Sequence, residues 1–261
     1  MHEDTTLASD IISEWDENAE VRHRQITSKI DLSYHKILIP TILKLVGNLH
    51  DRSVIDVGCG SGYLTAKLAV KASHTVGVDP SKKMIEIANR EYGQIPSLEF
   101  HNLSIKNFSH QNPHKQFEVA ISNMSLITIP HLDEAVEVIS SLLVPEGIFV
   151  FNITHPCFYN QYRKYESQES FQYNVPHPQK GDFLISLDKR GLKSTTTHFH
   201  RPLQKYFQSL RNASFIIDRL VEPFPKPEAE KRYPEHWKVP HFLSMRCVKL
   251  KCGSKAFFKQ T

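Results

Sequence analysis

The chain has 261 residues, of which 40% are hydrophobic and 23% are charged, and its formal net charge is +4 with histidine neutral. This composition is that of an ordinary globular protein, so it excludes disordered and fibrous classes, and the length suffices for a sizeable core. Lys and Arg are spread along the chain without a dense basic run, so the mild positive charge does not indicate a nucleic-acid partner.

The N-terminus, MHEDTTLASD, is acidic and lacks the positive flank and apolar core of a signal peptide. No stretch approaches the ~20 apolar residues that a membrane span needs. The four cysteines, Cys59, Cys157, Cys247 and Cys252, show neither CxxC pairs nor metal-like spacing, and they suit a reducing compartment. We therefore expect a soluble cytoplasmic protein without a membrane anchor or a metal site.

Residues 1–50 are predicted to form an N-terminal helical segment, because Ile11, Ile12 and Trp15 begin an apolar pattern at helical spacing. Short apolar runs then alternate with amphipathic helices over 51–154. This order predicts βαβ units and a doubly wound, mostly parallel sheet with helices on both faces. Strands are expected at 53–57, 74–79, 97–103, 117–123 and 147–153, and helices at 63–72, 81–93 and 131–144.

The pattern breaks down over 155–200, a stretch rich in Tyr, Gln, His and Ser that is predicted to be an insertion with one strand-like piece, DFLISL. Order returns over 201–261. A helix is expected at 202–214, with Leu203, Phe207 and Leu210 on one side, followed by strands at 215–222 and 241–250 and a proline-rich loop at 223–240 between them.

Three glycines, Gly58, Gly60 and Gly62, directly follow the first predicted strand. A glycine-rich turn between a strand and a helix lets a ligand approach the backbone, and the free N–H groups of the helix start attract negative charge. In the dinucleotide fingerprint GxGxxG the third glycine would occupy position 63, where this chain has Tyr63. The spacing therefore weakens the nicotinamide interpretation, although an NAD-dependent oxidoreductase remains an alternative.

The stretch IDVGCGSG, with Asp56 before the first glycine, resembles the first motif of class I S-adenosylmethionine-dependent methyltransferases. Asp79 ends the next strand, where an acidic residue can accept both ribose hydroxyls, and DPSKKMIEIA resembles the D-x-S-x-x-M pattern of this family. FEVAISNMSLITIPHLDEA and LLVPEGIFVF resemble its fourth loop and fifth strand. The end of the chain is similar to the small-molecule branch, and the resemblance implies a seven-stranded Rossmann-like sheet whose last strand is antiparallel.

The resemblance implies S-adenosylmethionine (SAM) as cofactor, S-adenosylhomocysteine (SAH) as product, and a loop after each strand that contributes contacts. In the third loop Ser104 stands where the family usually has an Asp that binds the adenine amino group. The cofactor-binding residues that it implies are Asp56, Gly58, Cys59, Gly60, Gly62, Asp79, Pro80, Met84, Ser104, Ile105, Asn123 and Met124.

The acceptor is expected beyond the carboxyl ends of the strands, under a lid made by the 155–200 insertion and the 223–240 loop, while the N-terminal segment closes over the cofactor. His155 and His200 are the candidate substrate or base residues because they fall near that end of the sheet. His241 opens the last predicted strand, after the proline-rich loop. The other pocket candidates are Tyr34, Tyr159, Tyr162, His198, Glu222 and Trp237.

These features predict methyl transfer from SAM to an O or N atom of a small organic molecule. An RNA methyltransferase is the first alternative, and a SAM-binding module without catalysis is another. An aminopropyltransferase would need an acidic polyamine pocket, for which the 155–200 insertion offers no cluster. The sequence does not predict the acceptor, the methylated atom or the oligomeric state.

Overall fold

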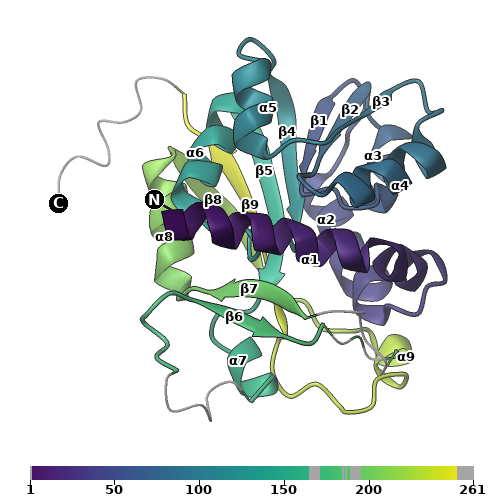
Figure 1. The fold of residues 1–261 in the computed structure, drawn as a ribbon, viewed down its shortest axis with the longest axis vertical. Coiled ribbons are helices and arrows are strands. Elements are labelled where there is room, and N and C mark those ends of the chain that lie inside the picture. The colour runs from purple at the N-terminus through teal and green to yellow at the C-terminus, as the bar shows by residue number, and fades with distance from the viewer. Residues whose placement is uncertain (1, 165–170, 184, 186, 189–194, 252–261) are drawn as a thin grey trace.

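The computed structural model describes residues 2–164, 171–183, 185, 187, 188 and 195–251. Their centre is a seven-stranded sheet in the order β3-β2-β1-β4-β5-β9-β8 (Figure 1). Neighbouring strands from β3 to β5 are parallel, and β9 runs antiparallel to both β5 and β8. The predicted Rossmann-like methyltransferase sheet with an antiparallel last strand is therefore confirmed.

The central strands β1, β2, β4 and β5 coincide closely with the predicted apolar runs, because they are buried on both faces and so read as continuous hydrophobic stretches, whereas β3 and β8, at the two edges of the sheet, are more exposed. The strands are β1 (Ser53–Val57), β2 (His74–Val78), β3 (Leu98–His101), β4 (Phe117–Asn123), β5 (Leu143–Thr154), β8 (Phe215–Val221) and β9 (Phe242–Lys249), with β6 (His177–Gly181) and β7 (Thr196–His200) in a separate antiparallel hairpin.

Helices cover both faces of the sheet. The helices are α1 (His2–Thr27), η1 (Tyr34–Leu38), α2 (Ile39–Val46), α3 (Tyr63–Ala69), α4 (Lys82–Tyr92), α5 (Ile105–Gln111), α6 (Leu132–Leu142), α7 (Tyr159–Tyr162), α8 (Leu203–Asn212) and α9 (Pro227–Glu230), of which η1 is a π-helix.

Alternate residues of each strand build two core clusters. Phe149 and Phe151 of β5 face α5, α6 and α8, whereas Ile148 and Val150 face η1, α2 and α3. This period of two is what a sheet with helices on both faces requires. The sheet is thus fixed on both sides, and the loops at the carboxyl ends of β1, β2 and β4 hold their positions relative to one another.

Two expectations for the second half of the chain are not confirmed. The strand pairing in the insertion joins β6 to β7. Within DFLISL (182–187), residues 184 and 186 lie outside the described residues, and Ile185 forms an isolated bridge with Asp188, which follows this stretch. Phe207 is 55% exposed, because α8 turns Tyr206 and Leu210 toward the core instead. Cys252 also lies outside the described residues.

The long helix α1 lies between the sheet layer and the β6–β7 hairpin (Figure 1). It packs on α4 at one side and on β7 at the other. The sheet, α1 and the β6–β7 hairpin surround the carboxyl ends of β1, β2 and β4. Helix α1 therefore covers the region where ligands bind in such sheets, and it is called the roof below.

Candidate active site

The glycine loop between β1 and α3 adopts left-handed backbone at all three glycines, with φ values of 72° at Gly58, 54° at Gly60 and 79° at Gly62. An added Cβ would lie 2.3 Å from Ser125 Cβ at Gly58 and 2.6 Å from Phe100 Cζ at Gly62. At Gly60 the nearest atom would be Met84 Sδ, 3.9 Å away. Two of the glycines are therefore required by packing, and Gly60 leaves open space.

A cavity of about 1020 Å³ opens at this loop. Gly58, Cys59 and Gly60 line it, whereas Gly62 does not, so the prediction that Gly62 contacts a ligand is not supported by the geometry. The volume lies at the upper end of the ~300–1,000 Å³ usual for ligand sites. One continuous space can thus hold a cofactor and an acceptor together.

Asp79 directly follows β2, the strand beside the glycine loop. Its Oδ2 accepts a hydrogen bond from Gly60 N and its Oδ1 accepts one from Ser81 N, each at 2.9 Å. Burial raises the pKa of the carboxyl to about 6. Each oxygen keeps further acceptor capacity, so a pair of hydroxyl groups such as those of a ribose fits this side chain.

Asp56, at the end of β1, has one satisfied and one unsatisfied oxygen. Its Oδ2 accepts from Thr65 Oγ1 at 2.8 Å, while the buried Oδ1 has no hydrogen bond among the described residues. Burial, together with the charge of Asp79, raises the pKa of Asp56 to about 7. An orphaned buried acceptor on the cavity wall is a site for a donor from a ligand, and an ammonium group matches it.

The third and fourth loops complete the cofactor side. Ser104 begins α5 as its N-cap, accepting from Asn107 N at 3.2 Å, and it lines the cavity beside Ile105. Asn123 Oδ1 accepts from Asn152 Nδ2 at 2.9 Å, and Met124 has a left-handed φ of 64°. The remaining predicted cofactor residues, Pro80 and Met84, also line the cavity.

The two histidines proposed as acceptor or base residues lie outside this cavity. His155 Nδ1 accepts from Cys157 N at 3.1 Å and its Nε2 bonds Glu222 Oε1 at 2.8 Å. His200 Nδ1 lies 2.9 Å from Asn160 Nδ2 and its Nε2 lies 2.8 Å from the Tyr173 carbonyl. Both rings are buried with both nitrogens engaged, so this geometry does not support the prediction that they face an acceptor.

Glu222 is likewise outside the cavity, since its carboxylate pairs with His155. The other five pocket candidates do line it, and they come from four separate segments of the chain. They are Tyr34, Tyr159, Tyr162, His198 and Trp237.

Arg22 and Phe183 line the cavity although the sequence patterns did not single them out. The Arg22 guanidinium pairs with Asp31 at 2.7 Å and lies over the rings of Tyr34 and Phe183, at 5.4 and 5.0 Å from their centroids. No local motif marks such residues, because helix α1 meets Phe183 only through the tertiary arrangement. His241 also lines the cavity.

Helix α1 is fastened to both sides of the cavity by polar contacts. Asp16 Oδ1 accepts from Ser81 Oγ at 2.6 Å and from Lys83 N at 3.0 Å, on the cofactor side. Glu14 accepts from Thr197 N at 2.7 Å and from Thr197 Oγ1 at 3.0 Å, on the hairpin side.

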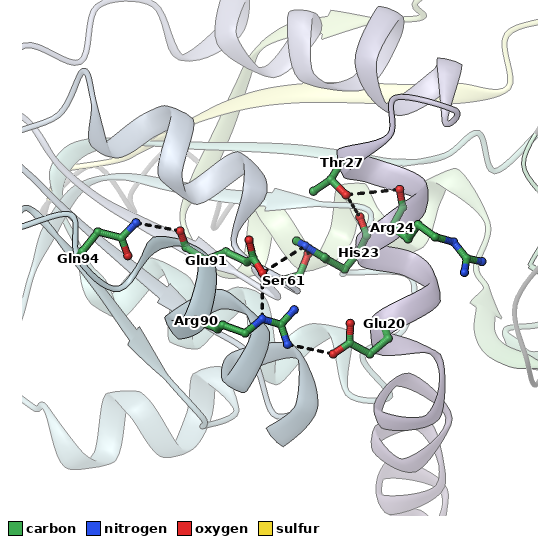
Figure 2. A network of polar contacts seen from close by, with 8 residues as sticks. All are labelled: Glu20, His23, Arg24, Thr27, Ser61, Arg90, Glu91 and Gln94. Atoms are coloured by element: carbon green, nitrogen blue, oxygen red, sulfur yellow. Dashed lines mark hydrogen bonds and ion pairs between the residues drawn. The ribbon is translucent and has the colours of Figure 1, made fainter.

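A second polar network ties the C-terminal half of α1 to α4 and to the glycine loop. Figure 2 shows Glu20 paired with Arg90, and His23 directed at Ser61 and Glu91. Arg90 also bonds Glu91, which joins the two contacts into one network. The helix is therefore held against the cofactor side by contacts that run from Asp16 to His23.

Within the part of the chain that the structure describes, no three His, Cys, Asp or Glu side chains come together as a metal site would require. The helices in that part are also too short or too polar to cross a membrane.

Comparison with known proteins agrees with this geometry. A family model described as "Methyltransferase domain" matches residues 49–207, which is more than half of the chain. A Haemophilus influenzae protein of uncharacterised function is 24% identical over 81% of this chain and 86% of its own. The ubiquinone biosynthesis O-methyltransferase of Nitrosomonas europaea is 26% identical over 52% of this chain, and the match spans 55% of that enzyme.

Solved structures share the fold. A SAM-dependent methyltransferase from Listeria monocytogenes superposes with a TM-score of 0.62 at 22% identity, over 81% of this chain and 97% of that one. The magnesium protoporphyrin IX methyltransferase of Synechocystis, solved with bound SAH, gives a TM-score of 0.62 at 14% identity, over 93% and 99%. The family match and the glycine loop, Asp56 and Asp79 around one cavity together place this chain in the class I SAM-dependent methyltransferase family.

Proposed function

We propose that this chain transfers the methyl group of SAM to an oxygen or nitrogen atom of a small, largely planar organic molecule. The observation that carries the proposal is one cavity of about 1020 Å³, whose lining includes both the glycine loop with Asp56 and Asp79 and a set of aromatic side chains. Both substrates of a methyl transfer must lie in one space, because the reaction is a direct in-line displacement.

The polar side of the cavity supports binding of SAM. Asp79 offers two acceptor oxygens for the ribose hydroxyls, and Asp56 Oδ1 is a buried acceptor for the ammonium group or a water attached to it. The open space above Gly60 admits the cofactor against the backbone. When bound, SAM supplies an electrophilic methyl group on a sulfonium.

The aromatic side supports a small planar acceptor. Tyr159, Tyr162, Phe183 and Trp237 line it, and aromatic side chains favour flat organic rings. Arg163 also lines the cavity. Its guanidinium donates a hydrogen bond to the Asp182 carbonyl at 2.9 Å, so part of its hydrogen-bonding capacity is used within the protein. An RNA acceptor would want a dense basic surface, for which the sequence offers no run.

The protein's contribution to the chemistry is mainly alignment, since positioning alone can supply ~7–11 kcal/mol of the barrier. As the new C–O or C–N bond forms, the C–S bond breaks and the thioether leaves as SAH. A phenol or carboxylic acid that arrives ionised needs no base, whereas a neutral acceptor must lose its proton to solvent or to a side chain.

The first test is calorimetric titration of wild type with SAM, SAH and NADH, repeated with Asp79→Asn. We expect micromolar binding of SAM and SAH by the wild type and no heat with NADH. Binding of SAM and SAH should be at least about tenfold weaker in the variant, because the amide has one acceptor oxygen and cannot accept hydrogen bonds from two hydroxyl groups as the two carboxylate oxygens do. Asp51→Asn is the matched control, since Asp51 is exposed and does not line the cavity.

The second test follows SAH release from SAM with panels of phenols, carboxylic acids, amines and RNA. Turnover with a member of the first three panels supports the proposal. Turnover with RNA alone would replace it with the RNA alternative. SAM binding without turnover on any panel would favour a binding module, and heat with NADH alone would overturn the cofactor assignment.

A further inference from the structure

The imidazole of His241 is held between two aromatic rings on the acceptor side of the cavity. Its ring centroid lies 3.8 Å from that of Tyr162, at an interplanar angle of 29°, and 3.7 Å from that of Trp237, at 25°. Both faces of the imidazole are therefore covered. Only the edge of the ring, with Nδ1 and Nε2, remains for a further contact.

That edge is not used within the protein. Neither ring nitrogen of His241 makes a hydrogen bond to the residues that the structure describes, although the residue is only 6% exposed. Buried polar side chains in proteins are normally hydrogen-bonded, and those left over in a ligand cavity are commonly completed by the ligand. His241 lines the cavity, so a ligand can reach it.

The imidazole is also neutral, since burial lowers the pKa of His241 to about 4. A neutral imidazole has one N–H donor and one unprotonated nitrogen that accepts. His155 and His200, by contrast, have both ring nitrogens engaged and lie outside the cavity. Among these three histidines, His241 is the one that offers an acceptor to a bound molecule.

His241 has a fixed position relative to the cofactor side. Its carbonyl accepts from His155 N at 2.8 Å, directly beyond the pairing of β5 with β9. The sheet registers Asn123 with Asn152 and Asn152 with Ser244, so His241 lies three residues further along, roughly 10 Å at the usual rise of a strand. It is attached to the sheet rather than to the lid, which suits a residue that sets orientation.

We propose that His241 recognises the methyl acceptor, and that its unprotonated ring nitrogen accepts a hydrogen bond from the hydroxyl group of a phenol. The proposal rests on the proposed function and narrows its acceptor to phenols. Tyr162 and Trp237 act as positioning residues, because their rings fix the plane of the imidazole and hence the direction from which a hydroxyl can donate.

The test compares phenol with anisole, which has the same ring and no hydroxyl donor, as probes of SAH-saturated protein. A Trp15→Phe background leaves Trp237 as the one tryptophan, so its fluorescence reports occupancy beside His241. We expect phenol to bind at least about tenfold more tightly than anisole, since the ether leaves the imidazole nitrogen unpaired.

The preference for phenol should disappear in His241→Phe, which keeps an aromatic ring between Tyr162 and Trp237 but has no nitrogen. His241→Asn retains an acceptor oxygen and should keep part of the preference for phenol. It provides a second measurement of that preference if the Phe variant is less stable than wild type. His236→Phe, in the same loop and with an exposed side chain, is the matched control and should behave as wild type.

Equal binding of the two probes, binding of neither, or a preference that survives His241→Phe would overturn the inference. Calorimetry with SAH on the same proteins distinguishes failure of the proposed function from failure of the role of His241. If SAH does not bind, the proposed function itself fails, whereas SAH binding without a preference for phenol refutes only the role of His241.

Discussion

Replacement of Asp56 by Asn should stabilise the ligand-free protein at alkaline pH. Burial raises the pKa of Asp56 from the ordinary value of 3.8 to about 7 in the folded state. An acid with a raised pKa in the folded state makes stability fall as pH rises, here between about pH 4 and pH 7. At ~1.4 kcal/mol per pH unit, ionisation of this carboxyl costs the folded protein about 4 kcal/mol at pH 8 and about 1.6 kcal/mol at pH 5.

The variant removes this cost but leaves an amide N–H₂ group buried, which opposes the gain by ~1–3 kcal/mol. That opposing contribution does not depend on pH. We therefore expect Asp56→Asn to raise the free energy of unfolding at pH 8 by about 2 kcal/mol, and the effect of the substitution to differ by about 3 kcal/mol between pH 8 and pH 5. SAM should bind the variant more weakly, because the anionic partner of its ammonium group is lost.

The assay is urea unfolding of dialysed, cofactor-free protein at the two pH values, since bound SAM would add its own stabilisation. Asp51→Asn is the control, because the exposed Asp51 has a φ of 61° that Asn tolerates. An effect of Asp56→Asn that is the same at pH 5 and pH 8, or a loss of stability at pH 8, would refute the reasoning.

Three further predictions concern the glycine loop, the roof and the cofactor. Gly62→Ala should lower the free energy of unfolding by at least about 2 kcal/mol, more than Gly47→Ala, because both have positive φ but only Gly62 has a ring against it; equal urea midpoints would contradict this. Glu14→Gln should speed SAH release several-fold in stopped-flow measurements, since it weakens the bonds to Thr197, and an unchanged rate would show that α1 does not gate the cofactor. SAM affinity should fall as pH drops below about 6, where the Asp79 carboxyl protonates, and Asp79→Asn should remove that part of the pH dependence in calorimetry.

The centre of the sheet could be predicted from the sequence because strands β1, β2, β4 and β5 are buried on both faces. The runs SVIDV and FEVAISN coincide with β1 and β4. Asp56 lies near the end of β1, and the glycine loop and Asp79 come directly after β1 and β2, so their places follow from those of the strands. The local pattern predicts the tertiary position of these residues, because each lies within a few residues of the strand that positions it.

The acceptor side could not be predicted equally well, because its residues come from segments that meet only in three dimensions. His155 and His200 were placed near the correct end of the sheet, yet the direction of each side chain is set by partners such as Glu222 and Asn160, which no local pattern identifies. His241 differs from them in that it lines the cavity, its ring nitrogens make no hydrogen bond to the described residues, and Tyr162 and Trp237 cover its faces.

The double attachment of α1 implies thermodynamic linkage between the two substrates. Asp16 fastens the helix beside Asp79 on the cofactor side, and Glu14 fastens it to Thr197 beside the acceptor. Helix α1 lines the cavity through residues such as Trp15 and Arg22, so a ligand that stabilises the position of this helix from one side favours the same position for the ligand on the other side. SAM and acceptor should therefore each raise the affinity of the other by the same factor, and SAH should leave slowly while the methylated product remains bound.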